Sequence, residues 1–169
     1  VLGRFGGRDR VAMLGFGVGV VATLLMVVLQ STSTISVERP WLALVITIGF
    51  VISERMVFHV EARNEAVSYV PSDIWLAIGM LTLNPIMIVS ARLVGSLLGM
   101  ALVRRLPLFK LAYNAVLLVF EAALAILLFR WLSAAAGEGV IATWASVIGS
   151  LFVALTSGGL LVAAAIAQF

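Results

Sequence analysis

The fold is decided by residues 104–130, RRLPLFKLAYNAVLLVFEAALAILLFR, in which basic residues precede a nearly continuous apolar run. About 20 apolar residues, at a rise of 1.5 Å per residue, span the roughly 30 Å hydrocarbon core of a bilayer. Asn114 and Glu121 interrupt the run, and their spacing of seven places them on one face of the predicted helix. A carboxylate at membrane depth is costly and usually faces a bundle interior or an aqueous cavity. The segment therefore predicts a transmembrane helix with helical partners on its polar face.

The composition of the whole chain supports a membrane protein. Of its 169 residues 63% are hydrophobic and only 11% are charged, and the mean hydropathy is +1.19. Soluble domains carry about 25% charged residues, so an ordinary water-soluble core is excluded. The net charge of +3 does not indicate nucleic-acid binding, because the basic residues flank apolar runs as membrane topology requires. Cysteine is absent and His59 is the only histidine, so we expect no disulfide, metal site or cofactor.

The first part of the chain predicts two helices. Residues 1–10 are glycine-rich and basic, and we expect a cytoplasmic segment there, followed by a single membrane domain over residues 11–169. Residues 11–29 predict the first transmembrane helix. The polar stretch 30–40 ends in a proline and predicts a loop. A second helix of about 20 residues is expected to start at residue 41 and to continue through Glu54 and Arg55 as far as residue 60.

Three glycines of the first predicted helix, Gly15, Gly17 and Gly19, leave two interpretations open. They could mark a close contact with another helix, or they could reflect the ordinary enrichment of glycine in membrane helices.

Residues 58–73, FHVEARNEAVSYVPSD, form a second and longer polar segment in the interior of the sequence. Apolar and polar residues alternate in part of it, with the period of a β-strand, and Asn64 is a typical turn residue. A small hairpin is therefore one alternative, and an irregular or amphipathic interfacial segment is the other. Ser72 or Asp73 is expected to cap a helix that begins at Ile74.

Residues 74–103 are interrupted by Asn84-Pro85, and two readings compete. The segment could form two short helices or one long helix with a proline kink. If residues 1–10 are cytoplasmic, two helices return the basic residues after position 103 to the cytoplasm. The positive-inside rule therefore favours two helices.

Residues 104–130 predict a fifth helix, and a last apolar run over residues 141–169 predicts a sixth. The sequence therefore predicts an all-α membrane protein with six transmembrane helices, of which the third and fourth are short and interrupted. Both termini are then cytoplasmic, and most of the lysines and arginines lie on the inner side of a plasma (inner) membrane. The tryptophans lie near the proposed helix ends, as interfacial aromatic residues do; they are Trp41, Trp75, Trp131 and Trp144.

Four polar residues are placed at membrane depth, namely Asn84, Arg92, Asn114 and Glu121. Consecutive helices are usually neighbours, so Arg92 and Glu121 are within reach of each other. Either the two form a structural ion pair, or all four line a polar pocket, open to the outer side, that holds a small ligand.

A second group of charges is expected on the cytoplasmic side and comprises Glu54, Arg55, Arg104, Arg105 and Lys110. Catalysis is not expected. A hydrolytic set could be sought only among His59, Ser68, Tyr69 and Asp73, and neither GxSxG nor HExxH nor a phosphate-binding loop occurs in the chain.

Residues 58–132 resemble the N-terminal multi-pass region of actinobacterial signalling proteins that continue into GGDEF and EAL domains. The resemblance lies in the polar segment, the apolar hairpin, the basic turn, and the later Lys110-Leu111, Asn114 and Glu121-Ala122. The region is also similar to membrane-associated sensor domains and, more remotely, to the S components of energy-coupling-factor vitamin transporters. Residues 141–169 lack the acidic residue often found in the last helix of the signalling family, which weighs against a ligand role for that helix.

The resemblance implies a membrane-embedded sensory domain that is not itself an enzyme. It would bind a small ligand or sense the state of the membrane, and it would control a cytoplasmic cyclic-di-GMP output domain beyond residue 169. The alternative is a substrate-binding subunit of a small-molecule importer, and a third is a structural anchor. The expected partners are the lipid bilayer, a small ligand, the output domain and a second copy in a homodimer.

Overall fold

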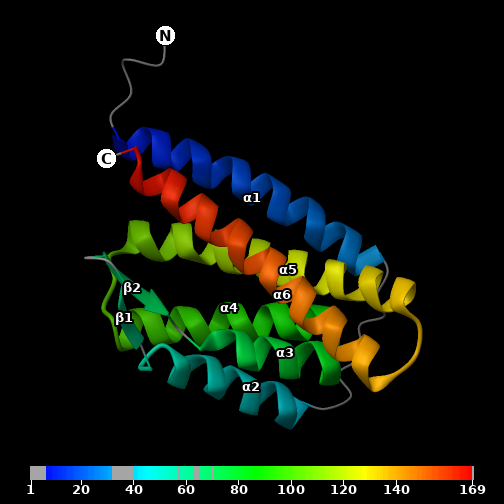
Figure 1. Ribbon diagram of the computed structural model, residues 1–169. Coiled ribbons are helices and arrows are strands. Elements are labelled where there is room, and N and C mark those ends of the chain that lie inside the picture. Colours follow the sequence, from blue (N-terminus) through cyan, green and yellow to red (C-terminus); the bar gives the residue numbers. More distant parts are fainter. Residues whose placement is uncertain (1–6, 32–39, 57, 63–64, 70, 169) are drawn as a thin grey trace.

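The computed structural model describes residues 7–31, 40–56, 58–62, 65–69 and 71–168. This part of the chain forms six helices and one two-stranded antiparallel sheet (Figure 1). The elements are α1 (Gly7–Ser31), α2 (Pro40–Ser53), β1 (Phe58–Ala62), β2 (Glu65–Tyr69), α3 (Ser72–Thr82), α4 (Pro85–Leu102), α5 (Leu108–Ala136) and α6 (Val140–Ile166).

Four of these helices, α1, α4, α5 and α6, are long and apolar enough to cross a membrane, among the residues described. Their 18 to 29 residues correspond to about 27–44 Å of helix. By contrast α2 has 14 residues and α3 has 11, about 21 and 16 Å. The expected bundle of membrane helices is confirmed. Of the six transmembrane helices expected, four are long enough for a full span.

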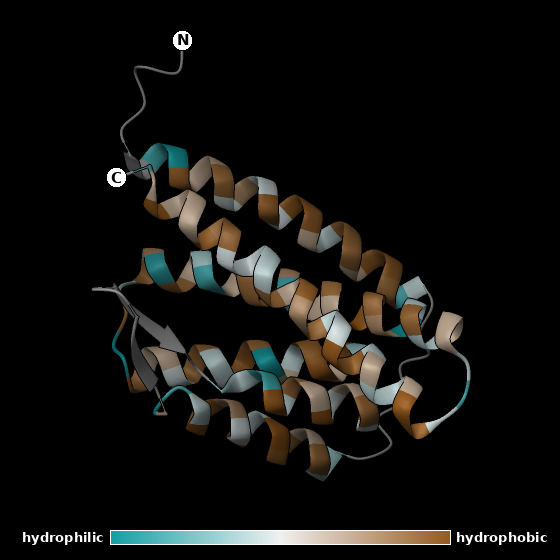
Figure 2. Cartoon of the chain, viewed as in Figure 1, coloured by the Kyte–Doolittle hydropathy of each residue, from teal (hydrophilic) through white to brown (hydrophobic). Residues whose placement is uncertain are grey.

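Hydrophobic residues dominate along the helices of the bundle (Figure 2), as expected of helices that cross a membrane. Large hydrophobic side chains are exposed along α1 and α6, among them Phe16, Leu24, Ile148, Phe152 and Leu160. The chain is therefore a membrane protein with transmembrane helices.

Helix α5 is the centre of the bundle. It packs against α1, α4 and α6, while α2 packs on the other side of α4, and α3 touches α2, α4, α5 and α6. Successive helices run in alternating directions, so α1 begins and α6 ends at the same end of the molecule (Figure 1). The common core includes Ile46, Phe50, Leu76, Ile88, Ala122 and Ile126.

The chain between residues 74 and 103 forms two helices, which confirms the alternative that the charge pattern favoured. Asn84 adopts an extended conformation as the N-cap of α4, and its Oδ1 accepts a hydrogen bond from the Ile86 N–H at 3.1 Å. Pro85 follows at the first helical position, where its missing N–H is harmless. The asparagine and the proline therefore start a new helix and do not kink an old one.

The prediction that the second helix continues through Glu54 and Arg55 to residue 60 was wrong. α2 ends at Ser53, and the backbone then turns, with hydrogen bonds from Arg55 N to Ile52 O at 2.9 Å and from Met56 N to Ser53 O at 3.0 Å. The alternating residues that follow form β1, which pairs with β2 so that Val60 lies opposite Val67. This is the hairpin alternative of the polar segment. Asn64, its expected turn residue, lies outside the described residues.

The predicted cap of the third helix was also wrong. The N-cap of α3 is Pro71, no side chain caps the helix, and Asp73 lies in its first turn. Its carboxylate Oδ1 lies 4.0 Å from the Nη2 of Arg92 on α4.

Glycines allow α2 and α4 to pack with their backbones close together. A Cβ at Gly95 would lie 2.5 Å from the Thr47 carbonyl oxygen and 2.7 Å from the Phe50 Cβ. One turn later, a Cβ at Gly99 would lie 2.6 Å from the Glu54 Cβ. Small residues spaced by four are typical of such close helix contacts in membranes.

Of the three glycines in α1, two face α5. A Cβ at Gly15 would lie 3.2 Å from the Tyr113 ring, and one at Gly19 would lie 3.6 Å from Val116. Gly17 has nothing within 4 Å. The helix-contact interpretation therefore holds for Gly15 and Gly19 but not for Gly17.

Candidate functional site

A charged pair lies inside the bundle and joins α4 to α5. The Arg92 Nη2 donates a hydrogen bond to the Glu121 Oε2 at 2.7 Å. Only 4% of the arginine side chain and 13% of the glutamate side chain are exposed. Such a short, charge-assisted bond is stronger than a neutral hydrogen bond, and it is the natural solution for two charges away from water.

A second carboxylate approaches the same guanidinium from α3. The Asp73 Oδ1 lies 4.0 Å from the Arg92 Nη2. Arg92 lies about 10 Å along α4 from its first residue, so the first turn of the short helix α3 begins near the middle of the bundle. Figure 2 shows the corresponding hydrophilic turn within the otherwise apolar α4. Two carboxylates therefore flank one guanidinium, whose Nε is buried and makes no hydrogen bond.

Helix α6 also meets this site, at Gly158. The Glu121 carboxylate occupies the position that a Cβ at Gly158 would take. The neighbouring Gly159 has nothing within 4 Å. The absence of a side chain at Gly158 thus leaves room for the carboxylate between α5 and α6.

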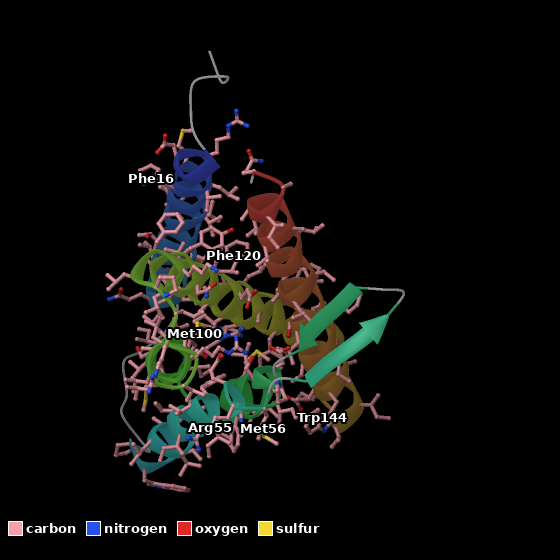
Figure 3. All side chains as sticks on the ribbon, turned by 90° about the vertical axis from the view of Figure 1, so that its left-hand side faces the viewer. Phe16, Arg55, Met56, Met100, Phe120 and Trp144 are labelled. Atoms are coloured by element: carbon pink, nitrogen blue, oxygen red, sulfur yellow. The ribbon has the colours of Figure 1, made fainter. Side chains whose placement is uncertain are left out.

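The structure brings Arg92 and Glu121 together but leaves the two asparagines elsewhere. Asn84 caps α4. Asn114 contacts α4 through its Nδ2, which lies 3.5 Å from the Met100 Sδ, near the end where α4 meets α5 (Figure 3).

Two cavities lie beside α5 near this end. One, of about 660 Å³, lies between α1, α5 and α6 and is lined in part by Lys110, Tyr113 and Asn114. The other is an apolar groove of about 550 Å³ between α1 and α5. Asn114 lines the first cavity, whereas Asn84, Arg92 and Glu121 line neither.

The expected cytoplasmic-side charges lie together at one end, but only two of them form an ion pair among the described contacts. The Arg104 Nε lies 3.2 Å from the Glu54 Oε2, and Glu54 is only 3% exposed because α2 and α4 meet there. Burial raises the pKa of the Glu54 carboxyl above its ordinary value, and the positive charges of Arg104 and Arg92 oppose this rise. Arg55, Arg105 and Lys110 are exposed.

Chemically, the interior site can hold charge, share hydrogen bonds and link helices. In the described part of the chain, no three His, Cys, Asp or Glu residues are grouped so as to hold a metal ion. Of the four residues considered for hydrolysis, Asp73 is part of the interior cluster. The side chains of His59, Ser68 and Tyr69 lie outside the described residues.

Sequence reasoning missed Gly95, Gly99 and Gly158 as parts of this arrangement. For the first two a signal exists, because Ala91, Gly95 and Gly99 form a small-residue pattern with a spacing of four. Gly158 stands beside Gly159 in the sequence, and only the packing distinguishes them.

No protein-family model matches this chain, and neither a curated protein nor a solved structure matches it.

Proposed function

We propose that this chain is a membrane-embedded input domain, in which a small ligand or the state of the bilayer changes the packing of helices around Arg92 and Glu121. The observation that carries the proposal is the 2.7 Å pair between α4 and α5, with Asp73 of α3 beside it and Gly158 of α6 against the carboxylate. A change at this point reaches four helices at once.

The physical basis is that a buried ion pair favours discrete arrangements. Separating two charges inside a bundle leaves each one uncompensated, so intermediate positions are unfavourable. A ligand that binds better to one arrangement shifts the population towards it. Because Glu121 fills the space at Gly158, such a shift moves α6 relative to α5.

In the full proposal, α2 and α3 complete a six-crossing topology in the inner membrane with both ends of the chain in the cytoplasm. The gathering of basic residues at one end supports this orientation, since Arg10, Arg55, Arg104, Arg105 and Lys110 all belong to the ends of α1, α2, α4 and α5 that lie there (Figures 1 and 2). Control of a cyclic-di-GMP output domain by α6 rests on the sequence resemblance alone.

A substrate-capture subunit of a small-molecule importer is the second candidate. It is favoured by the 11-residue helix α3, whose first turn brings Asp73 near Arg92 in the middle of the bundle. Short helices that start at membrane depth beside polar groups are typical of substrate sites in transporters.

The input proposal is tested by measuring whether α6 moves. The chain contains no cysteine, so spin labels can be attached after Leu102→Cys on α4 and Leu160→Cys on α6, both exposed positions. In lipid nanodiscs, Gly158→Ala and Glu121→Gln are expected to shift the distance distribution between the labels. Gly159→Ala is the matched control and is expected to leave it unchanged.

Identical distributions in all four proteins would contradict an input role and indicate a static anchor. The importer candidate predicts a different result, namely that a water-soluble vitamin raises the melting temperature of the wild type but not of Arg92→Lys, with no displacement of α6.

A further inference from the structure

The cavity between α1, α5 and α6 combines an apolar wall with polar groups at its end. Val11, Val162 and Ile166 are among its apolar residues, and Lys110 and Asn114 supply an ammonium and an amide. The groove between α1 and α5 adjoins it, because both are lined by Val11, Phe109 and Tyr113.

Tyr113 gives this region a defined shape. Its hydroxyl donates a hydrogen bond to the Leu161 carbonyl oxygen of α6 at 3.1 Å, and its ring packs over Gly15 of α1. One side chain therefore bridges the two helices that flank α5. Seen from this end, α1 and α6 stand on either side of α5, and Phe16 projects from the outer side of α1 (Figure 3).

Among the described residues, the only charged one that lines the cavity, Lys110, is positive. Neither lining contains an acidic residue. Arg104 and Arg105 lie in the connection between α4 and α5, and Arg10 lies in the first turns of α1, at the same end of the molecule. Asp9 is the acidic residue nearest to Val11 in the sequence, and it does not line the cavity.

We propose that this cavity binds an anionic phospholipid of the surrounding bilayer. Its phosphate would lie at the Lys110 ammonium and its ester region at the Asn114 amide, with an acyl chain along the apolar groove between α1 and α5. Basic pockets between transmembrane helices at the inner surface have the chemistry that recognises such head groups. A zwitterionic lipid fits the apolar walls equally well but brings no net charge to Lys110. This inference does not depend on the proposed input role, since a lipid can bind whether or not α6 moves.

The test uses the purified full chain in detergent, with phosphatidylglycerol or phosphatidylcholine added in equal amounts. Retained lipid is counted by native mass spectrometry. The wild type is expected to retain phosphatidylglycerol about fivefold more than phosphatidylcholine, which is the effect of one lysine near the membrane surface. Lys110→Gln keeps a polar side chain, one bond shorter, but removes the positive charge, and it is expected to abolish the preference.

Arg105→Gln is the matched control, because Arg105 is exposed at the same end but does not line the cavity. It is expected to keep the preference. Equal loss in both variants, or equal retention of the two lipids by the wild type, would overturn the proposal. Competition by glycerol phosphate as strong as that by phosphatidylglycerol would overturn it too, because the acyl chain would then contribute nothing.

Discussion

At the scale of single residues, Arg92 links the interior charges of three helices, α3, α4 and α5. Its guanidinium is the positive charge next to Glu121 and Asp73, and its side chain is almost completely buried. The pair itself adds little net stability, because removing both charges from water costs about as much as their attraction returns. Removing one partner is far more costly than removing both.

We therefore predict that Arg92→Met lowers the free energy of unfolding by about 3–5 kcal/mol, because it leaves Glu121 buried without its partner. The double variant Arg92→Met/Glu121→Met is expected to recover the part of this loss that comes from the uncompensated Glu121, while Asp73 still lacks the guanidinium. Thermal unfolding in nanodiscs measures both, with the exposed Arg105→Met as the control. Additive losses in the double variant would show that the two side chains do not stabilise each other.

Glu54 gives a prediction about pH. Burial raises the pKa of its carboxyl in the folded protein above its value of 4.5 in the unfolded chain. The folded state therefore holds this proton to a higher pH than the unfolded state does, so the contribution of Glu54 to stability is complete below pH 4.5 and is lost as pH rises through the raised pKa.

Accordingly, the melting temperature of the wild type minus that of Glu54→Gln is expected to increase as the pH is lowered from 8 to 4. Measurement in micelles suffices, and Glu138→Gln, at an exposed position, serves as the control. A difference that shrinks on acidification would mean that the Arg104 charge outweighs burial.

At the scale of elements, α4 depends on small residues on the side that faces α2. The atoms that a Cβ at Gly95 would meet include the Thr47 backbone carbonyl oxygen, and a backbone atom of a packed helix cannot easily give way. We predict that Gly95→Ala destabilises the protein by about 1–3 kcal/mol through overpacking.

Gly17→Ala is the matched control, because a Cβ there meets nothing within 4 Å. The same exchange in a helix with free space is expected to stabilise by up to about 1 kcal/mol. Equal effects of the two exchanges on unfolding in detergent would show that helix propensity, not the contact between α2 and α4, sets the outcome.

At the scale of the whole molecule, two groups of helices meet along one seam, which is the contact between α4 and α5. α1 and α6 pack on α5, α2 packs on α4, and α4 and α5 join the two groups, with α3 touching both (Figure 1). The interior charges of α4 and α5 lie on this seam. A change in the pairing of Arg92 therefore acts between the two groups, and through Glu121 it also reaches Gly158 of α6.

The sequence predicted the parts of this molecule that depend on local pattern. The long apolar runs gave α1, α5 and α6, and Asn84-Pro85 separated α3 from α4. The end of α2 at Ser53 was missed, and Glu54, which follows it, pairs with the distant Arg104, a contact that local sequence does not reveal. The close fit of Glu121 against Gly158 is set by the register between two helices, and neither helix specifies that register alone.

The central place of α5 has a consequence for how the protein is made. α1 packs mainly on α5, yet residues 32–107 are synthesised between them. During translation the face of α1 that carries Gly15 and Gly19 is therefore exposed to lipid until α5 enters the bilayer. In ribosome-bound nascent chains, the thiol of Gly19→Cys should react with a lipid-soluble reagent before residue 136 has been inserted, and it should be protected afterwards. Equal reactivity at both stages would show that the packing of α1 does not depend on the insertion of α5.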